Sequence, residues 1–163
     1  MNKYEQALAR ARKGLPLDEI FPELKVKTAD NFVDLGLPSG RLWAKENEGD
    51  FYSFDAAVEI FGKELPSKEA WVELFDECTR EWDKAKKGYT LIGPNGNSIF
   101  LPAAGYRSGT TVGNVGLIGH YWSSSPYSTA THAYGVFFYA GGVNPQGSSG
   151  RFYGFSVRLA RES

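Results

Sequence analysis

Residues 119–163 read GHYWSSSPYSTATHAYGVFFYAGGVNPQGSSGRFYGFSVRLARES. Large aromatic residues alternate there with Gly, Ala, Ser and Thr, and no Lys, Arg, Asp or Glu occurs between Trp122 and Gly150. Tyrosine gives a large contact area at a low cost in conformational entropy, while serine and glycine adapt to the shape of a partner. The stretch is therefore expected to form a recognition surface held on a scaffold.

Residues 134–139, YGVFFY, predict a β-strand with two different faces. Successive side chains of a strand point to opposite sides, so Val136 and Phe138 are expected on the core side. Phe137 and Tyr139 then lie on the outer side as an exposed aromatic pair. The alternative is that this pair contacts a second packed layer.

Two polar segments, 128–132 and 146–150, lie on either side of this strand in the sequence and are interpreted as loops. Loops on a rigid sheet are common positions for ligand contacts, although most surface loops only connect elements. In the final strand, alternation places only one of Phe152 and Tyr153 outward. Tyr153 is favoured, because its hydroxyl group benefits from contact with water.

Upstream of this stretch, the apolar spacing predicts a hairpin and two helices. Residues 32–44 alternate weakly around the turn formers Pro-Ser-Gly, which is typical of a β-hairpin. Helices are expected over 54–61 and from 68 to about 79, after Ser53 and Ser67, whose side chains can cap free N–H groups. The apolar residues expected to be buried are Phe54, Ala57, Val58 and Phe61 in the first helix, and Trp71, Leu74 and Phe75 in the second.

The rest of the chain from residue 89 has the pattern of strands and turns. Strands are predicted over 89–92, 98–101, 121–125 and 155–159, with a turn at 93–97 and a Gly-rich loop at 108–116. Helices that come first and strands that cluster later are typical of an α+β fold. Two helices with mixed or antiparallel sheets are therefore expected.

Residues 1–30 are interpreted as a separate N-terminal helical segment and linker. Short helices are expected over 3–13 and 17–24, with apolar residues at helical spacing. This segment is predicted to form a short helical appendage that could contact an assembly partner. The globular domain is predicted to cover residues 31–163, with its binding face at 119–155.

Composition excludes several classes of protein. The chain has 163 residues, a formal net charge of −1 and one cysteine, so neither nucleic-acid binding through a basic surface nor an internal disulfide is expected. No run approaches the ~18 apolar residues of a membrane-spanning helix, and the start has no apolar signal-peptide core. Synthesis in the cytoplasm without a signal peptide, and no membrane span, are therefore expected.

Five segments, taken together, are similar to one protein family. They are FVDLGLPSGRLWA (32–44), LPSKEAWVEL (65–74), GPNGNSIFLPAAGYR (93–107), YWSSSPY (121–127) and YGFSVRL (153–159). In this order they resemble the Bacteroidetes major-paralogous-domain family, which has the C-type lectin fold of formylglycine-generating-enzyme relatives. Within it, the chain more closely resembles the variable proteins of diversity-generating retroelements.

The resemblance implies a C-terminal region that adenine-directed mutagenesis rewrites. Randomised asparagine codons yield Ser, Thr, Ala, Gly, His, Tyr, Phe and Asp among others, but not Lys, Glu, Gln, Met or Trp. The candidate positions from 129 to 153 hold only permitted residues, although a Gly- and Ser-rich loop would satisfy this by composition alone. The candidate ligand-binding residues are His120, Thr129, Ala130, Thr131, His132, Gly135, Phe137, Tyr139, Gly142, Gly147, Ser148, Ser149, Gly150 and Tyr153.

No catalytic residue, cofactor or metal site is predicted. His120 and His132 have no acidic residue nearby in the uncharged stretch, so both are interpreted as neutral contact residues. Calcium is not expected either, because its sites need several carboxylate and amide oxygens. The one thiol, Cys78, is expected to be buried and inert on the second helix. The arginines Arg107, Arg158 and Arg161 could form an anion clamp, but pairing with acidic residues of the helices is favoured.

These patterns lead to a non-enzymatic recognition protein. The first hypothesis is a retroelement-diversified variable protein, carried by a phage virion or displayed through a partner, that binds a protein or glycan on a target cell surface. The alternative is a carbohydrate- or peptide-binding surface module of the same family with a fixed sequence. A degenerate relative of the oxidase enzymes on this fold is a third class.

Overall fold

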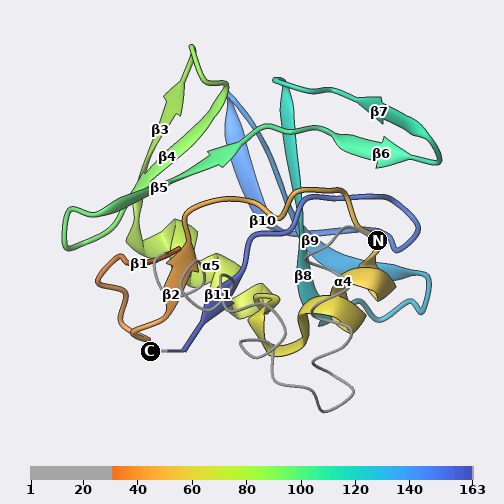
Figure 1. The fold of residues 1–163 in the computed structure, drawn as a ribbon, viewed down its shortest axis with the longest axis horizontal. Helices are drawn as coiled ribbons and strands as arrows, with labels where there is room; N and C mark the ends of the chain where they lie inside the picture. The colour runs from red at the N-terminus through yellow and green to blue at the C-terminus, as the bar shows by residue number, and fades with distance from the viewer. Residues whose placement is uncertain (1–30, 163) are drawn as a thin grey trace, which may run out of the picture.

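The computed structural model describes residues 31–162 (Figure 1). This part of the chain is α+β, with two α-helices and several small antiparallel sheets among the described residues. The helices expected over 3–13 and 17–24 lie outside it. Within residues 31–162, no helix is long and apolar enough to cross a membrane.

The two ends of the described chain meet in one sheet. The predicted hairpin consists of β1 (Phe32–Asp34) and β2 (Leu42–Ala44), and β11 (Ala160–Arg161) pairs antiparallel with the other edge of β2. A strand over 155–159 was expected to complete the main sheet, and this is wrong. Residues 157–159 form no strand, and Phe155 and Ser156 make only single bridges, to Tyr52 and Tyr121.

Two helices follow, as the serine caps predict. In α4 (Phe54–Phe61), the Ser53 side chain accepts a hydrogen bond from the N–H of Ala56; in α5 (Lys68–Glu77), Ser67 does the same for Ala70. A short 3₁₀ turn, η1 (Gly62–Glu64), follows α4. Val58 was expected to be buried but is 39% exposed, because the apolar face of α4 is narrower than the spacing implies.

The first of the two larger sheets, in the order β3-β4-β5, begins directly after α5. It contains β3 (Thr79–Asp83), β4 (Gly88–Ile92) and β5 (Ser98–Pro102). The pairing of β4 with β5 and the turn between them confirm the predicted hairpin. The helix expected to run to about residue 79 ends at Glu77, because the chain turns there into β3, which pairs along its whole length with β4.

The second sheet, in the order β10-β9-β8, contains the predicted recognition strand. Its members are β8 (Ile118–Pro126), β9 (His132–Tyr139) and β10 (Gly142–Gly150). Before it, β6 (Tyr106–Ser108) and β7 (Thr111–Gly113) form a two-stranded ribbon where a Gly-rich loop was expected. Segment 146–150, also expected as a loop, is part of β10, because its main chain extends the ladder along the edge of β9.

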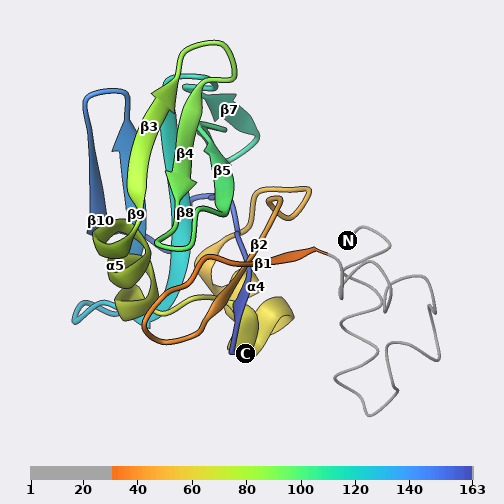
Figure 2. The same ribbon diagram turned by 90° about the vertical axis from the view of Figure 1, so that its left-hand side faces the viewer.

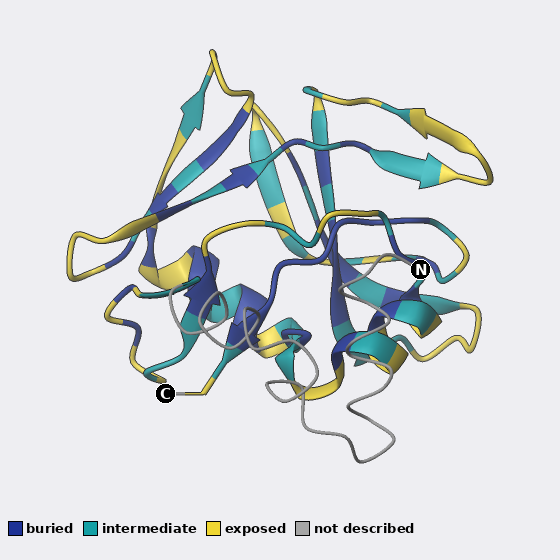
Figure 3. Ribbon diagram, viewed as in Figure 1, coloured by how far each residue is buried: buried dark blue, intermediate teal, exposed yellow. Residues whose placement is uncertain are grey.

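Two apolar clusters bury opposite faces of the β8–β9–β10 sheet. The first cluster joins α5 and the β3–β4–β5 sheet to Tyr121, Val136 and Phe138. The second joins α4 to Trp122, Ala133 and the segment around Phe155. Figure 2 shows the two sheets side by side with the helices beyond one end of them, and Figure 3 shows the buried segments meeting between these elements. Trp43, Trp71 and Trp122 are fully buried in these clusters, as predicted for Trp71.

Arg158 is buried, and its hydrogen bonds go to uncharged oxygens, while the carboxylates of Glu46 and Glu48 favour its charge from further away. Its guanidinium donates hydrogen bonds to the side-chain oxygen of Asn47 (2.9 Å) and to the main-chain oxygens of Ala44 (3.0 Å) and Phe100 (2.6 Å). The expectation that three arginines pair with helix acids holds only for Arg161, which contacts Glu64 of η1 at 3.0 Å. Arg107 pairs instead with Asp50, which lies in a loop.

Replacing Arg158 with methionine should lower the free energy of unfolding by about 3–5 kcal/mol, because three buried acceptors lose their donor at once. Arg161→Met is the matched control. Its ion pair with Glu64 is partly exposed, so a loss of about 0–1 kcal/mol is expected. Urea denaturation of both variants measures the difference. Equal losses would show that the buried hydrogen bonds of Arg158 are not a major contribution.

Candidate functional site

Six aromatic side chains form a continuous row on one side of the β8–β9–β10 sheet, and we call this row the aromatic face. Adjacent rings have centroids 4.3 to 6.0 Å apart, which is contact distance for aromatic pairs. In order along the row, its members are Phe152, Tyr153, Tyr106, His120, Phe137 and Tyr139. Phe152 is 71% exposed and Tyr139 is 50% exposed, so both ends of the row are open to solvent.

Strand pairing positions one half of the aromatic face. His120 of β8 is directly opposite Phe137 of β9, and Ile118 is opposite Tyr139. Side chains of directly opposed residues share a face of the sheet, so the rings of His120 and Phe137 meet at 5.0 Å. The predicted alternation is confirmed here, since Val136 and Phe138 are buried on the other side.

Loop contacts position the other half. Tyr106 starts β6, which is fixed by two main-chain hydrogen bonds between Arg107 and Gly154, each 2.8 Å. Phe152 and Tyr153 lie in the turn after β10. Beneath the row, the buried ring of Phe155 stacks on His120 at 4.3 Å and lies parallel to Tyr153 at 6.0 Å. The rings are therefore held by packing against a core residue.

The aromatic face is almost free of charge. From Ser108 to Gly150 the sequence contains no Lys, Arg, Asp or Glu. The nearest arginines, Arg107 and Arg151, pair with Asp50 (3.5 Å) and Asp55 (3.9 Å). A ligand on this face would thus meet rings, main chain and uncharged polar groups, with paired charges at the rim.

Burial lowers the pKa of His120 from 6.5 to about 4. The imidazole stacked on Phe155 is therefore neutral near pH 7, as expected from the sequence. The other histidine, His132, lies on the opposite side of the sheet, and its Nδ1 is 2.9 Å from the hydroxyl oxygen of Thr131.

The structure brings together only part of the predicted set. Eight of the fourteen candidates lie on the same side as the aromatic face or in its row: His120, Gly135, Phe137, Tyr139, Gly142, Gly147, Ser149 and Tyr153. Three face the opposite side, namely His132, Ser148 and Gly150. Thr129, Ala130 and Thr131 form the turn before β9, and the main-chain oxygen of Thr131 accepts a hydrogen bond from the N–H of Arg151 (2.9 Å), next to Phe152 at one end of the row.

Two predicted contact positions have no room for a side chain. Gly135 is buried, and a Cβ there would lie 2.7 Å from the main-chain oxygen of Tyr121. Gly150 is also buried, with the Phe152 ring 2.6 Å from the position of a Cβ. Both therefore serve the close packing of the sheet and the turn.

Sequence reasoning missed Phe152 and Tyr106. Phe152 was expected inward and Tyr153 outward, and the structure reverses this, because residues 151–153 form a turn in which strand alternation does not hold. Tyr153 is half-buried against the second cluster. Tyr106 comes from the expected start of a loop, and only tertiary packing beside His120 places it in the row.

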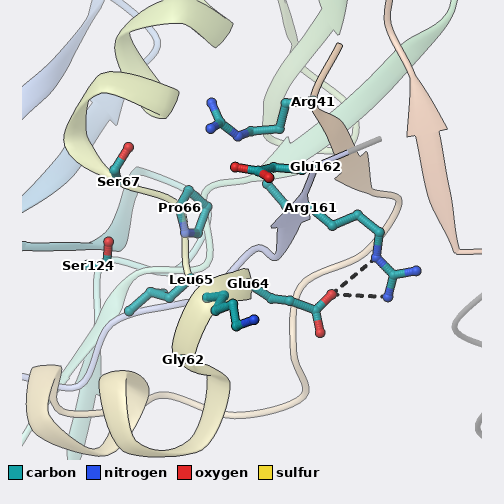
Figure 4. Close-up of a pocket in the computed structure, with 11 residues that line it drawn as sticks. Arg41, Gly62, Glu64, Leu65, Pro66, Ser67, Ser124, Arg161 and Glu162 are labelled. Carbon is teal, nitrogen blue, oxygen red and sulfur yellow. Dashed lines mark hydrogen bonds and ion pairs between the residues drawn. The ribbon is translucent and has the colours of Figure 1, made fainter. Parts of the chain in front are cut away.

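A separate cavity of about 460 Å³ lies between the α4–α5 connection and β11 (Figure 4). Leu65, Pro66 and Ala160 line it together with the hydroxyl groups of Ser67 and Ser124. Its charged residues have both signs, and the Arg161–Glu64 ion pair lies at one side. None of its lining residues belongs to the aromatic face.

The Cys78 thiol is buried at the end of α5. Burial, and to a lesser extent the nearby carboxylates of Glu77 and Glu73, raise the pKa of the Cys78 thiol to about 11, so the thiolate is scarce at neutral pH. No three His, Cys, Asp or Glu side chains of the described chain are grouped as metal ligands would be.

Substitutions along β9 should separate the two sides of the strand. Phe138→Ala should cost about 3–5 kcal/mol of stability, because it empties a core position. Tyr139→Ala, one residue further on, should change stability by no more than about 0.5 kcal/mol. Thermal melts of the two variants test this contrast. Equal destabilisation would place Tyr139 in a packed layer and remove it from the binding face.

His120 should also make stability depend on pH. Its folded pKa lies below its unfolded value, so the unfolded state binds more protons as the pH falls below about 6.5. The stability from neutral His120 is full above that pH and decreases as the pH falls towards 4. His120→Phe should weaken this decrease in melts from pH 7 to pH 4. Identical profiles for the variant and wild type would contradict a buried neutral His120.

Comparison with known proteins gives one match. A family model described as a domain of unknown function, DUF8237, matches residues 79–160, which extend from β3 to β11 and include the whole aromatic face. No curated protein matches the chain, and no solved structure does. Because the match covers half of the sequence, the chain belongs to the DUF8237 family.

Proposed function

We propose that this protein is a non-enzymatic ligand-recognition protein that binds its partner through the aromatic face. The observation that supports this most directly is the row of six touching rings, open at Phe152 and Tyr139, whose neighbouring arginines Arg107 and Arg151 are paired with aspartates. The centres of protein interfaces are enriched in aromatic residues and depleted of charged ones. Solvated surfaces that only cover a core are normally charged.

The rings are pre-organised for binding. Each ring in the row contacts the next, and Phe155 supports the middle of the row from below. Side chains that are fixed before binding lose little conformational entropy when a partner docks. The other side of the sheet beneath them is packed against the first cluster through Tyr121, Val136 and Phe138, which supports binding without rearrangement.

The finer form of the proposal is a variable protein of a diversity-generating retroelement, with a C-type lectin fold, on a phage virion or displayed through a partner. The α+β order of two helices followed by strands supports it. So does the position of Phe137, Tyr139, Gly142 and Ser149 on the side of the sheet that carries the aromatic face. The partner would then be a protein or glycan on a target cell surface. A fixed-sequence carbohydrate- or peptide-binding module is the alternative.

The DNA around the gene separates the two forms. A variable protein requires an adjacent reverse transcriptase and an imperfect repeat of the sequence that encodes the C-terminal region. Mismatches should fall at adenines, and they should affect the codons of residues 137 and 139 but spare that of Gly135, where no side chain fits. Scattered mismatches, or no repeat, would favour the fixed-sequence module.

Binding should depend on the exposed ends of the row. The fluorescently labelled chain would be applied to a glycan array and to a panel of intact bacterial cells, beside the double variant Phe152→Ser with Tyr139→Ser. Binding should fall at least about tenfold, because the two exposed anchors are lost. Val58→Ser, an exposed position on α4, is the matched control and should bind normally. Unchanged binding by the double variant would exclude the aromatic face as the site.

A further inference from the structure

The β6–β7 ribbon extends away from the body of the molecule (Figure 1), and we call residues 106–117 the β-arm. Three large aliphatic side chains of the β-arm are exposed: Val112 (45%), Val115 (66%) and Leu117 (64%). A two-stranded ribbon is only marginally stable by itself in water. Exposed apolar side chains on such a ribbon therefore indicate a contact surface.

The two edges of the β-arm differ. The outer edge of β6 is occupied, since the N–H and C=O of Arg107 both bond to Gly154 at 2.8 Å. Arg107 is directly opposite Val112, and paired residues of an antiparallel ladder turn their main-chain groups either both inward or both outward. Val112 therefore directs its own N–H and C=O to the outer edge of β7, which pairs with no other strand of the described chain.

The β-arm has none of the features that usually protect an edge strand from pairing with another strand. Natural edge strands are usually protected by charged side chains, proline or a covering segment. Residues 108–117, SGTTVGNVGL, contain no charged residue and no proline. The only charge of the β-arm is on Arg107, whose guanidinium contacts Asp50 (3.5 Å) and donates to the main-chain oxygen of Phe51 (3.1 Å).

We propose that the β7 edge pairs antiparallel with β7 of a second copy of this chain. A two-fold axis beside Val112 places the two Val112 residues opposite each other. Each then donates its N–H to the other's C=O, which satisfies all the outward main-chain groups of both. The same axis brings together two sets of the three exposed aliphatic side chains.

The surface is self-complementary in charge as well as in hydrogen bonding. An isologous contact opposes each side chain with its own copy or with a close neighbour, so a charged edge would repel itself. The β7 strand itself carries no charge, and Lys87 is a cation beside the β-arm, with its side chain against Gly116. These features favour a second copy over a foreign strand, for which the uncharged, symmetric edge offers no particular recognition. The inference is independent of the proposed ligand-binding function.

The experiment measures self-association of the full-length chain by sedimentation equilibrium from about 1 µM to about 1 mM. Wild-type protein is expected to form dimers as the concentration rises. Val112→Lys should raise the dimer dissociation constant at least about tenfold, because the charge is placed beside its own copy. Val58→Lys is the matched control, since Val58 is similarly exposed on α4, far from the β-arm in Figure 1. Val112→Thr should dimerise like wild type.

Four outcomes would overturn the proposal. They are a monomer at every concentration, equal weakening by Val112→Lys and Val58→Lys, an assembly other than a dimer, and a dimer that Phe152→Ser disrupts while Val112→Lys does not. The last outcome would assign self-association to the aromatic face. Equal thermal melts of the lysine variants and wild type establish that a loss of dimer is not a loss of folding.

Discussion

The buried guanidinium of Arg158 holds together parts of the chain that no sheet connects. Its acceptors lie in β2, in the loop after β2 and in β5, and Asn47 continues the network to the hydroxyl group of Tyr121. Burial lowers the pKa of Arg158, and Tyr121 and the carboxylates of Glu46 and Glu48 oppose this effect, so its charge depends on these groups together with the hydrogen bonds. The same segment carries Phe155, three residues earlier, on which His120 stacks. The geometry of the aromatic face is therefore linked to a polar contact in the core.

The β8–β9–β10 sheet packs against both apolar clusters and also carries the aromatic face. Val136 and Phe138 fill the first cluster from one side of β9, while Ala133 on the other side contributes to the second cluster. The second cluster covers only the start of β9. Past Gly135 that side is open, and Phe137 and Tyr139 reach solvent. A strand packed in this way cannot slip by one residue without moving Val136 and Phe138 from the core to the solvent side, which fixes the direction of the rings.

Local signals explain which parts of the fold could be predicted. Ser53 and Ser67 specify helix starts through contacts three residues away, and the turn formers at 93–97 specify a hairpin. Strands that depend on a partner could not be predicted. β3 is rich in charged residues and β10 contains Gly and Pro, so neither has the sequence pattern of a strand. Each forms a strand because it adds to the edge of a neighbouring strand, β4 or β9. Alternation along β9 predicted two of the six members of the aromatic face, Phe137 and Tyr139. Tyr106 and Phe152 join it through tertiary contacts alone.

Because β10 is an edge strand, the stability of the fold depends little on which side chains β10 carries on its open side. Gly142, Asn144 and Gly147 face outward beside β9, and the strand is held by its main-chain ladder and by Val143, which packs on the first cluster. Side chains on the open side of such a strand can be exchanged at little cost, because they contribute few buried contacts. The same holds for Tyr139 at the end of β9. The open side of β10 and the end of β9 therefore contribute little to the stability of the fold.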